Sequence, residues 1–292
     1  MQPKEPSRTA WGAARHRAVH QLAEGGRIFK DPLAVPILGV DPSAAEDAAF
    51  LFETDDNPGS RMLRFFIVSR SAFAEAKLAE AVGEREVSQL VVLGAGFDTF
   101  AYRNPFGEPL RVFEVDHPAT QAWKRERLAA MDIAQPDWPT FVGVDFERES
   151  FAERLAESGF DASRRTFVFW LGVSMYLTEA TVDATLAAVA AWPGGGEIVF
   201  DYAEPPPEDM TEQARVAREA LRARVAAVGE PFRSALEPEA LHSRLGELGY
   251  SDIEDHGPLD LAARFLGPEV AAAAKAAGAG GPGGGHVLFA RT

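Results

Sequence analysis

The stretch Leu90-Val91-Val92-Leu93-Gly94-Ala95-Gly96-Phe97-Asp98-Thr99 decides the fold of this chain. Its four leading apolar residues are typical of a central parallel strand that is covered on both faces. Gly94 and Gly96 allow the backbone to turn tightly and to approach a ligand that a Cβ would exclude. Nucleotide-like ligands bind at such turns on the carboxyl edge of a sheet, although the same pattern also occurs in purely structural turns.

The residues after the second glycine narrow the class of ligand. A dinucleotide fingerprint has Gly or Ala three residues after its second Gly, so that the helix packs closely beneath a pyrophosphate. Here Thr99 occupies that position, with Asp98 before it. A carboxylate near the helix start would repel a pyrophosphate but suits a ligand with an amino group and no phosphate, such as S-adenosylmethionine. An NAD-dependent oxidoreductase is the rival enzyme class.

The composition bounds the class of protein. The chain has 292 residues, 46 % of them hydrophobic, and no cysteine, which excludes disulfides, thiolate zinc sites and a cysteine nucleophile. No apolar run approaches the roughly 20 residues that cross a membrane, and the first 17 residues hold no signal-peptide core. The formal net charge of −15 argues against binding to a phosphate backbone. We expect a cytoplasmic protein without nucleic acid, membrane or metal as partners; its oligomeric state stays open.

From Gln89 onward, short apolar runs alternate with amphipathic segments, which predicts a doubly wound α/β domain. The candidate strands are residues 90–93, 111–115, 140–144, 166–171, 197–202, 251–255 and 286–290. The candidate helices between them are residues 119–131, 150–158, 179–191 and 238–248. Seven strands, with the last one returning after a long insertion, are the number expected of the class I methyltransferase variant of the Rossmann-like fold.

Two further regions are expected to be helical. Residues 1–88 predict an N-terminal cap with helices at 11–24 and 61–82, followed by the Rossmann-like domain at 89–292. Within that domain, the segment at about 204–236 begins with three prolines and continues as a charged helix. It is either a surface excursion or a lid over the substrate. Arginines of the cap form a solvated helix face or present their charge to an anionic group.

Carboxylates follow the second and third predicted strands. Asp116 comes 20 residues after Gly96, where an acidic side chain can accept hydrogen bonds from ribose hydroxyls. Asp145 follows the third strand and could accept from an adenine amino group, with Phe146 packing on the ring. Asp145 could equally be a helix N-cap. Together with the glycine turn, these residues predict a nucleoside site at the tips of three strands.

The fourth strand and the residues after it carry a family resemblance. The chain resembles the leucine carboxyl methyltransferase family, in its actinobacterial small-molecule branch. The matching motifs are Thr9–Arg15, Asp31–Ala34, Leu93–Thr99 with Tyr102-Arg103, Glu114–Pro118, Val144–Phe146, Gly172–Leu177 and Asp201-Tyr202.

This resemblance implies a site for S-adenosylmethionine as cofactor. Gly94 and Gly96 would pass under the methionine part, and Arg70 would pair with its carboxylate, although Ser69 competes for that position. Asp116 would hold the ribose, and Asp145 with Phe146 the adenine. Family members usually carry Glu where this chain has Leu171, and the loss of that carboxylate removes a hydrogen bond worth roughly 1.5–3 kcal/mol if nothing replaces it.

Methyl transfer from a sulfonium is an in-line displacement that chiefly requires the acceptor to be positioned with water excluded. A carboxylate acceptor is already ionised at neutral pH, whereas a hydroxyl benefits from a general base. Tyr176 could orient the acceptor oxygen, and the anionic group could be bound by Arg15 and Arg17. Three histidines could act as the base or be merely capping or surface residues: His16, His20 and His117.

We therefore expect an S-adenosylmethionine-dependent O-methyltransferase that acts on a carboxylate or hydroxyl of a small molecule of secondary metabolism. The alternative is a protein of the same fold that binds the cofactor but has lost or altered the transfer reaction. Leu171 is the residue that keeps this alternative open.

Overall fold

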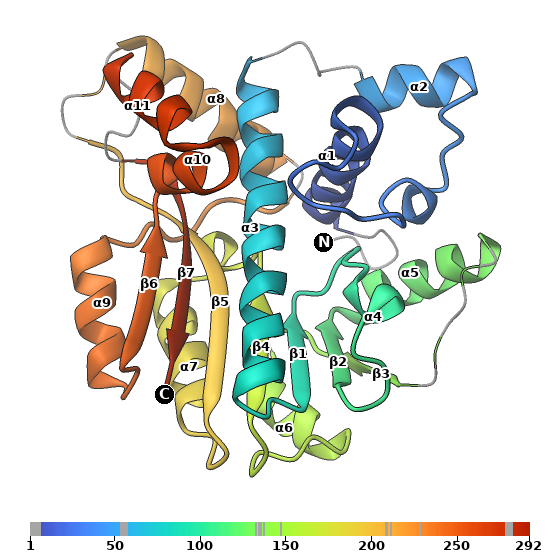
Figure 1. The fold of residues 1–292 in the computed structure, drawn as a ribbon, viewed down its shortest axis with the longest axis vertical. Coiled ribbons are helices and arrows are strands. Elements are labelled where there is room, and N and C mark those ends of the chain that lie inside the picture. Colours follow the sequence, from blue (N-terminus) through green and yellow to red (C-terminus); the bar gives the residue numbers. More distant parts are fainter. Residues whose placement is uncertain are drawn as a thin grey trace. The chain divides into compact units, whose positions relative to one another are not determined.

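A computed structural model describes residues 7–52, 58–131, 133, 136, 138–146, 148–207, 210, 212–227, 229–277 and 283–292. The chain forms two compact units, Met1–Asp161 and Ala162–Thr292 (Figure 1), and each is treated separately below.

The first unit holds three parallel strands in the order β3-β2-β1. Leu93 of β1 pairs with Val115 of β2, and Asp116 of β2 pairs with Gly143 of β3, so the three strands end at the same edge. The glycine turn and the predicted carboxylates follow these ends. The elements of this unit are α1 (Arg8–Glu24), η1 (Pro36–Leu38), α2 (Ala45–Phe52), α3 (Pro58–Glu84), β1 (Gln89–Leu93), α4 (Phe100–Arg103), β2 (Arg111–Asp116), α5 (Pro118–Ala130), β3 (Pro139–Gly143) and α6 (Phe151–Glu157).

The cap helices share a core with the glycine turn. Ala14 and Ala18 of α1 are fully buried in one hydrophobic cluster with Phe97 of the turn and Leu128 of α5. Helix α1 also packs against α3, which leads directly into the fully buried β1 (Figure 1). The cap is thus part of the unit that carries the glycine turn.

The second unit holds four strands in the order β4-β5-β7-β6. Strands β4 and β5 are parallel, and β7 runs antiparallel to both of its neighbours. The elements are β4 (Thr166–Trp170), η2 (Ser174–Tyr176), α7 (Glu179–Ala190), β5 (Gly196–Ala203), α8 (Glu212–Ala227), α9 (Pro238–Glu247), β6 (Asp252–His256), α10 (Pro258–Leu266), α11 (Pro268–Ala276) and β7 (Gly285–Arg291).

The strand predictions are confirmed for all seven strands, and no strand end differs by more than one residue. The short helices α2, α4 and α10 are not predicted from the sequence. Helix α8 lies in the predicted lid at about 204–236, of which residues 208, 209, 211 and 228 lie outside the described residues. The same holds for residues 1–6 and 53–57 of the predicted cap.

The division into compact units falls after Asp161 and does not coincide with the predicted boundary at residue 88.

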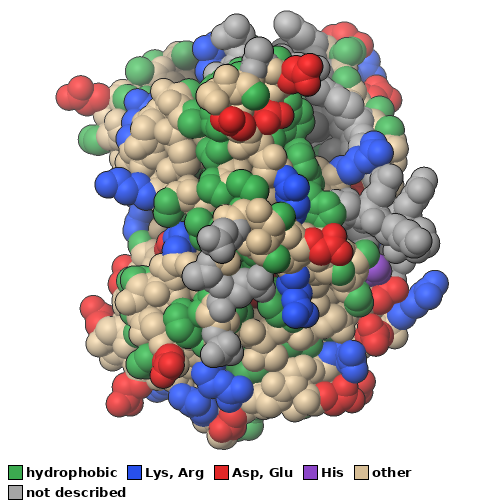
Figure 2. All heavy atoms as spheres, turned by 90° about the vertical axis from the view of Figure 1, so that its right-hand side faces the viewer, with side chains coloured by type: hydrophobic (Ala, Val, Ile, Leu, Met, Phe, Trp, Pro, Cys, Tyr) green, Lys and Arg blue, Asp and Glu red, His purple; other side chains and the backbone are tan. Residues whose placement is uncertain are grey.

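Among the described residues, no helix combines the length and the apolar character that crossing a membrane requires. On the face shown in Figure 2, Lys and Arg side chains are interspersed with Asp and Glu side chains.

Candidate functional site

The glycine turn is fixed to the end of β2 by backbone hydrogen bonds. Gly94 and Gly96 both have left-handed backbone, with φ of +67° and +46°, which favours glycine at these two positions. The N–H groups of Gly94 and Ala95 donate to the Val115 carbonyl at 2.8 and 3.1 Å. The N–H of Gly96 donates to the Asp116 carboxylate. The turn and the carboxylate are therefore positioned together.

In the part of the chain that the structure describes, the Asp116 carboxylate accepts hydrogen bonds from two backbone N–H groups. Oδ2 accepts from Gly96, and Oδ1 accepts from the N–H of His117 at 2.6 Å. Burial raises the pKa of Asp116, and these two hydrogen bonds only partly oppose that rise. A carboxylate has about four lone-pair sites, so each oxygen keeps one for a further donor. A ribose, which offers two hydroxyls, fits this remaining capacity.

Helix α1 lies against Gly96. A Cβ built on this glycine would come within 3.0 Å of the Cβ of Ala10, which is too close without a shift. The glycine pattern predicts that the missing Cβ makes room for a ligand. In the structure the space next to Gly96 is occupied by Ala10 of the cap helix α1, so the cap covers the turn at this point.

Asp145 and Phe146 follow β3 next to Asp116. The N–H of Val144 donates to the Asp116 carbonyl at 2.9 Å, which brings the ends of the two strands together. The Asp145 side chain is 33 % exposed and lies 3.7 Å from Arg148. The N-cap interpretation of Asp145 is wrong, because α6 is capped by Ser150. Asp145 is thus left as a partly exposed carboxylate beside Asp116.

Two polar residues of α3 are buried. Ser69 is fully buried, and its Oγ has no hydrogen-bond partner in the part of the chain that the structure describes. Arg70 is 9 % exposed, and its guanidinium carbon lies 5.8 Å from the centre of the Phe66 ring. Counting back from the end of α3 at 1.5 Å per residue, both residues lie about 22 Å along the helix, beyond the level of the five-residue β1. An unsatisfied buried hydroxyl at this level fits a polar ligand group.

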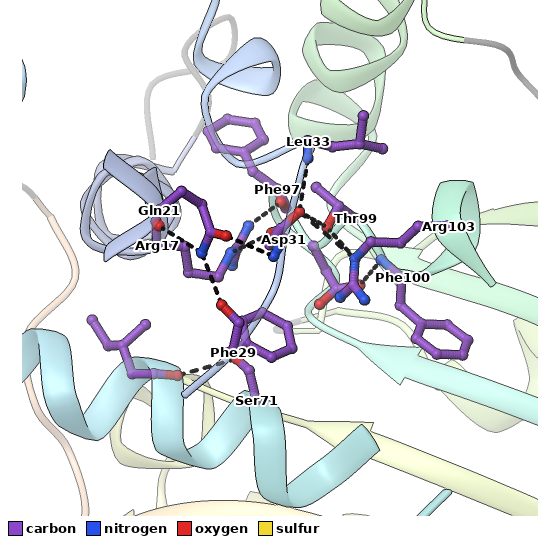
Figure 3. Close-up of polar contacts among 12 residues, drawn as sticks. Arg17, Gln21, Phe29, Asp31, Leu33, Ser71, Phe97, Thr99, Phe100 and Arg103 are labelled. Atoms are coloured by element: carbon purple, nitrogen blue, oxygen red, sulfur yellow. Dashed lines mark hydrogen bonds and ion pairs between the residues drawn. The ribbon is translucent and has the colours of Figure 1, made fainter. Parts of the chain in front are cut away.

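A buried polar network joins the cap to the distal half of the turn (Figure 3). Asp31 is fully buried and accepts from Arg17 Nε at 3.1 Å and from the Thr99 hydroxyl at 2.8 Å. Arg17 Nη2 also donates to the Phe97 carbonyl at 2.5 Å. Arg103 donates to Thr99 Oγ1 at 2.9 Å. Thr99 is therefore the residue through which the turn is bound to the cap.

These contacts bear on the predicted substrate arginines. The Arg17 side chain is 9 % exposed, and its guanidinium donates to Asp31 and to the Phe97 carbonyl, so contacts within the protein explain its position. Arg15 is half-buried, with its guanidinium carbon 5.7 Å from the centre of the Phe50 ring. Neither contact tests whether these arginines bind a substrate, which stays a prediction.

Two of the three candidate bases use their ring nitrogens within the protein. His20 Nε2 accepts from the N–H groups of Ile28 and Phe29 at 3.3 Å, and Nδ1 lies 2.7 Å from Glu24. His117 caps α5, since its Nδ1 accepts from the Ala119 N–H at 3.2 Å. This hydrogen-bond pattern assigns the proton of the neutral His117 ring to Nε2, so in this state the ring offers a donor and not a base. His16 is buried on α1.

The second unit holds the remaining predicted residues. Leu171 is half-buried directly after β4, and the N–H of Gly172 donates to the buried Asp201 carboxylate at 2.5 Å. Tyr176 of η2 stacks on Phe232, with ring centres 5.4 Å apart. The Met175 carbonyl between them accepts from the Arg233 N–H at 2.8 Å. The segment after the lid helix thus orders the Tyr176 ring.

Comparisons with known proteins identify the family. A family model described as leucine carboxyl methyltransferase matches residues 10–190. The chain belongs to the leucine carboxyl methyltransferase family. It is 30 % identical over 282 residues to the Bacillus subtilis "Putative S-adenosyl-L-methionine-dependent methyltransferase YktD", covering 89 % of this chain and 91 % of that protein. A Streptomyces coelicolor relative with the same description, SCO7813, is 33 % identical over 67 % of this chain and 68 % of its own length.

Solved structures show the same fold. A "putative methyltransferase" from Thermobifida fusca matches with a TM-score of 0.55 at 18 % identity, over 88 % of this chain and 92 % of that one. The mycolic acid cyclopropane synthase CmaA1, complexed with S-adenosylhomocysteine, matches with a TM-score of 0.52 at 14 % identity, over 96 % and 98 %. The predicted class I methyltransferase fold is confirmed. This family member is an S-adenosylmethionine-dependent methyltransferase.

Sequence reasoning missed two features of the site. Asp31 and Arg103 were seen only as parts of family motifs, and their network with Thr99 depends on how α1 packs. The second feature is the buried pair of Glu114 and Lys124, which are 1 % exposed. One signal was present in the sequence: Glu114 lies two residues before Asp116, on the same face of β2.

Proposed function

We propose that this methyltransferase transfers a methyl group to an oxygen of a small molecule of secondary metabolism in the cytoplasm, with a carboxylate as the preferred acceptor and a hydroxyl as the second candidate. The observation that carries the preference is the hydrogen bonding of two of the three candidate histidines. His20 and His117 both accept backbone N–H groups, so neither offers a base for a hydroxyl. A carboxylate needs no base, since it is ionised at neutral pH.

The proposed cofactor site is centred on Asp116. Its free lone pairs would bind the ribose hydroxyls, while Asp145 and Phe146 would contact the adenine. Gly94 and Gly96 would pass under the methionine part. The buried Ser69 hydroxyl and Arg70 are the candidates for its carboxylate, and the unsatisfied Ser69 Oγ supports the fit of a polar ligand group there.

When bound, S-adenosylmethionine supplies an electrophilic methyl group on a sulfonium. The acceptor oxygen forms a bond to this methyl carbon as the carbon–sulfur bond breaks, so a carboxylate loses its negative charge and S-adenosylhomocysteine leaves without the sulfonium charge. Chain residues then have two tasks, which are to orient the acceptor and to exclude water. In our proposal Tyr176 orients the acceptor oxygen and Arg15 attracts its charge. The cap (residues 1–88) excludes water from the glycine turn.

A second candidate function is cofactor binding without methyl transfer. The observation that favours it is Leu171, which is half-buried where family members usually carry Glu. In that case the protein would bind S-adenosylmethionine and S-adenosylhomocysteine but methylate no acceptor.

Calorimetric titration with S-adenosylmethionine, S-adenosylhomocysteine and NAD tests the site. We expect binding of the two adenosyl ligands, no binding of NAD, and loss of adenosyl binding in Asp116→Asn. Incubation with S-adenosylmethionine and panels of carboxylic acids and phenols then tests the acceptor. A product heavier by one CH₂ that releases methanol in mild alkali is a methyl ester, whereas an alkali-stable product is an ether and would contradict the carboxylate preference.

A further inference from the structure

A buried ion pair lies beside Asp116 on β2. Lys124 Nζ contacts both carboxylate oxygens of Glu114, at 2.8 and 2.9 Å, and both side chains are 1 % exposed. Glu114 and Asp116 alternate by two residues, so they lie on one face of the strand, about 6.6 Å apart along it. Because the four-carbon side chain of a lysine is flexible, its ammonium can reach either of two carboxylates at this spacing.

The helix that carries Lys124 is anchored independently of the Glu114 side chain. Gln121, one turn before Lys124 on α5, donates to the backbone carbonyls of Glu114 and Val142 at 2.9 and 3.0 Å. These bonds attach α5 to β2 and β3 through main-chain acceptors. A change of the Glu114 side chain therefore leaves the backbone of Lys124 in place. Only the Lys124 ammonium becomes free to move.

Asp116 is the carboxylate on this face that has lone pairs to spare. Burial raises its pKa, and the N–H groups of Gly96 and His117 oppose the rise, as does the positive charge of Lys124. The ammonium thus already acts electrostatically on Asp116. The nearby Asp98 already uses one carboxylate oxygen, Oδ1, to accept a hydrogen bond from the Phe100 N–H at 2.8 Å.

We propose that Glu114 is a positioning residue for cofactor binding: by holding the Lys124 ammonium with both oxygens, it keeps this cation away from Asp116. The lone pairs of Asp116 then stay open to the ribose hydroxyls. This inference rests on the assignment of Asp116 to the ribose under Proposed function. Capture of Asp116 by Lys124 and binding of the ribose exclude each other, because both use the same lone pairs.

Two variants test this role by titration with S-adenosylhomocysteine. In Glu114→Gln the ammonium loses the opposite charge and one of its two acceptor oxygens, so the charged Asp116 becomes its stronger partner. We expect the dissociation constant to rise about tenfold or more, the scale of one lost hydrogen bond to a charged group. In Glu114→Gln/Lys124→Met no cation competes, and we expect affinity within about threefold of the wild type. Neutral side chains of similar volume are tolerated at buried ion-pair positions, so the double variant is expected to fold.

Rescue by the second substitution distinguishes positioning from packing. If Glu114 merely supports β2, both variants bind equally weakly, and the inference is overturned. Unchanged affinity in Glu114→Gln overturns it as well. If Glu114→Gln does not fold, the double variant still decides, since loss of S-adenosylhomocysteine binding there contradicts the proposal and retention supports it. Wild-type protein that binds no S-adenosylhomocysteine would overturn the proposed function itself, whereas wild-type binding with no effect of Glu114→Gln overturns only this inference.

Discussion

Asp116 in the first unit and Asp255 in the second are both carboxylates near the carboxyl end of a strand, yet their surroundings differ. Asp116 accepts hydrogen bonds from two backbone N–H groups, those of Gly96 and His117. Asp255 is bound by three side chains, with Tyr202 Oη at 2.5 Å, His242 Nε2 at 2.8 Å and His286 Nδ1 at 3.0 Å. The first carboxylate keeps lone pairs for a ligand, whereas the second is committed to joining β5, β6 and β7.

The pKa values of the two carboxyls shift in opposite directions. Burial dominates at Asp116 and raises its pKa. Burial also acts to raise the pKa of Asp255, but hydrogen bonds from His286 and Tyr202 and the charge of His286 outweigh it and lower the pKa. Where donors within the protein use the lone pairs of a carboxylate, removing its charge is therefore expected to lower the stability of the fold. Where lone pairs remain open, removing the charge is expected to lower the affinity for the ligand.

Asp31 is a carboxylate that is both saturated and fully buried, and it gives the largest expected effect. It is fully buried against Arg17, and Thr99 and the Leu33 N–H also donate to it. Asp31→Ala leaves the Arg17 charge buried without its partner, and we expect a loss of about 3–5 kcal/mol in the free energy of unfolding. Urea denaturation measures it. The control is Asp41→Ala, which removes an exposed carboxylate that accepts from the N–H and the hydroxyl of Ser43 and should cost far less stability than Asp31→Ala. Equal losses in the two variants would contradict the saturation argument.

Asp116→Asn gives the next largest effect, on affinity. Loss of two hydrogen bonds between a charged carboxylate and the ribose is expected to weaken S-adenosylhomocysteine binding about a hundredfold or more. The free energy of unfolding should fall less than in Asp255→Asn. The amide NH2 faces one of the two backbone N–H donors, of Gly96 or His117, but removal of a buried charge offsets part of that cost. Asp255→Asn is the matched control, and we expect the reverse: lower stability with the dissociation constant unchanged. Calorimetry measures the dissociation constant of both variants, and urea denaturation measures their free energy of unfolding. Weakened binding in Asp255→Asn would contradict the proposed difference between the two carboxylates.

The strands and the position of Asp116 could be predicted from sequence because each depends on local pattern. Apolar runs such as Leu90–Leu93 mark buried strands, and the spacing from Gly96 to Asp116 follows from one strand–helix–strand unit. The family motifs indicated S-adenosylmethionine as the cofactor, and the comparisons with known proteins support this prediction.

The connections between distant residues could not be predicted in this way. Pairing of Lys124 with Glu114 requires α5 to pack on β2, and the placement of Ala10 on Gly96 requires α1 to lie across the turn. Both follow from tertiary packing, for which a single sequence carries no direct signal. Arg17 is a further example: its hydrogen bonds to Asp31 and to the Phe97 carbonyl depend on how α1 packs, and the sequence did not indicate them.

Ser69→Ala sharpens the comparison on a smaller scale. If the unsatisfied Ser69 hydroxyl binds the methionine part of the cofactor, the variant should bind S-adenosylhomocysteine about three- to tenfold more weakly, the value of one neutral hydrogen bond. Stability should not fall, because an unsatisfied buried hydroxyl is itself unfavourable. Ser71→Ala is the control on the same helix, since its hydroxyl is already satisfied by the Ile67 carbonyl at 3.1 Å. Calorimetry that finds equal affinity in Ser69→Ala and the wild type would remove Ser69 from the site.

The smallest effect is the pH dependence of stability that arises from the saturated cluster. Burial alone would lower the pKa of His286, but the hydrogen bond and charge of Asp255, together with the charge of Glu204, raise it. A raised folded-state pKa means that the stabilisation is fully present below the unfolded value of about 6.5 and is lost as the pH rises through the folded value. The melting temperature should therefore fall more steeply between about pH 6 and pH 9 in the wild type than in His286→Gln, as scanning calorimetry can measure. Asp255 stays ionised over this range because its pKa is lowered, so the difference between the two curves reports on His286. Parallel curves would mean that the His286–Asp255 contact does not favour the protonated ring, and the contrast with Asp116 would then rest on hydrogen bonds alone.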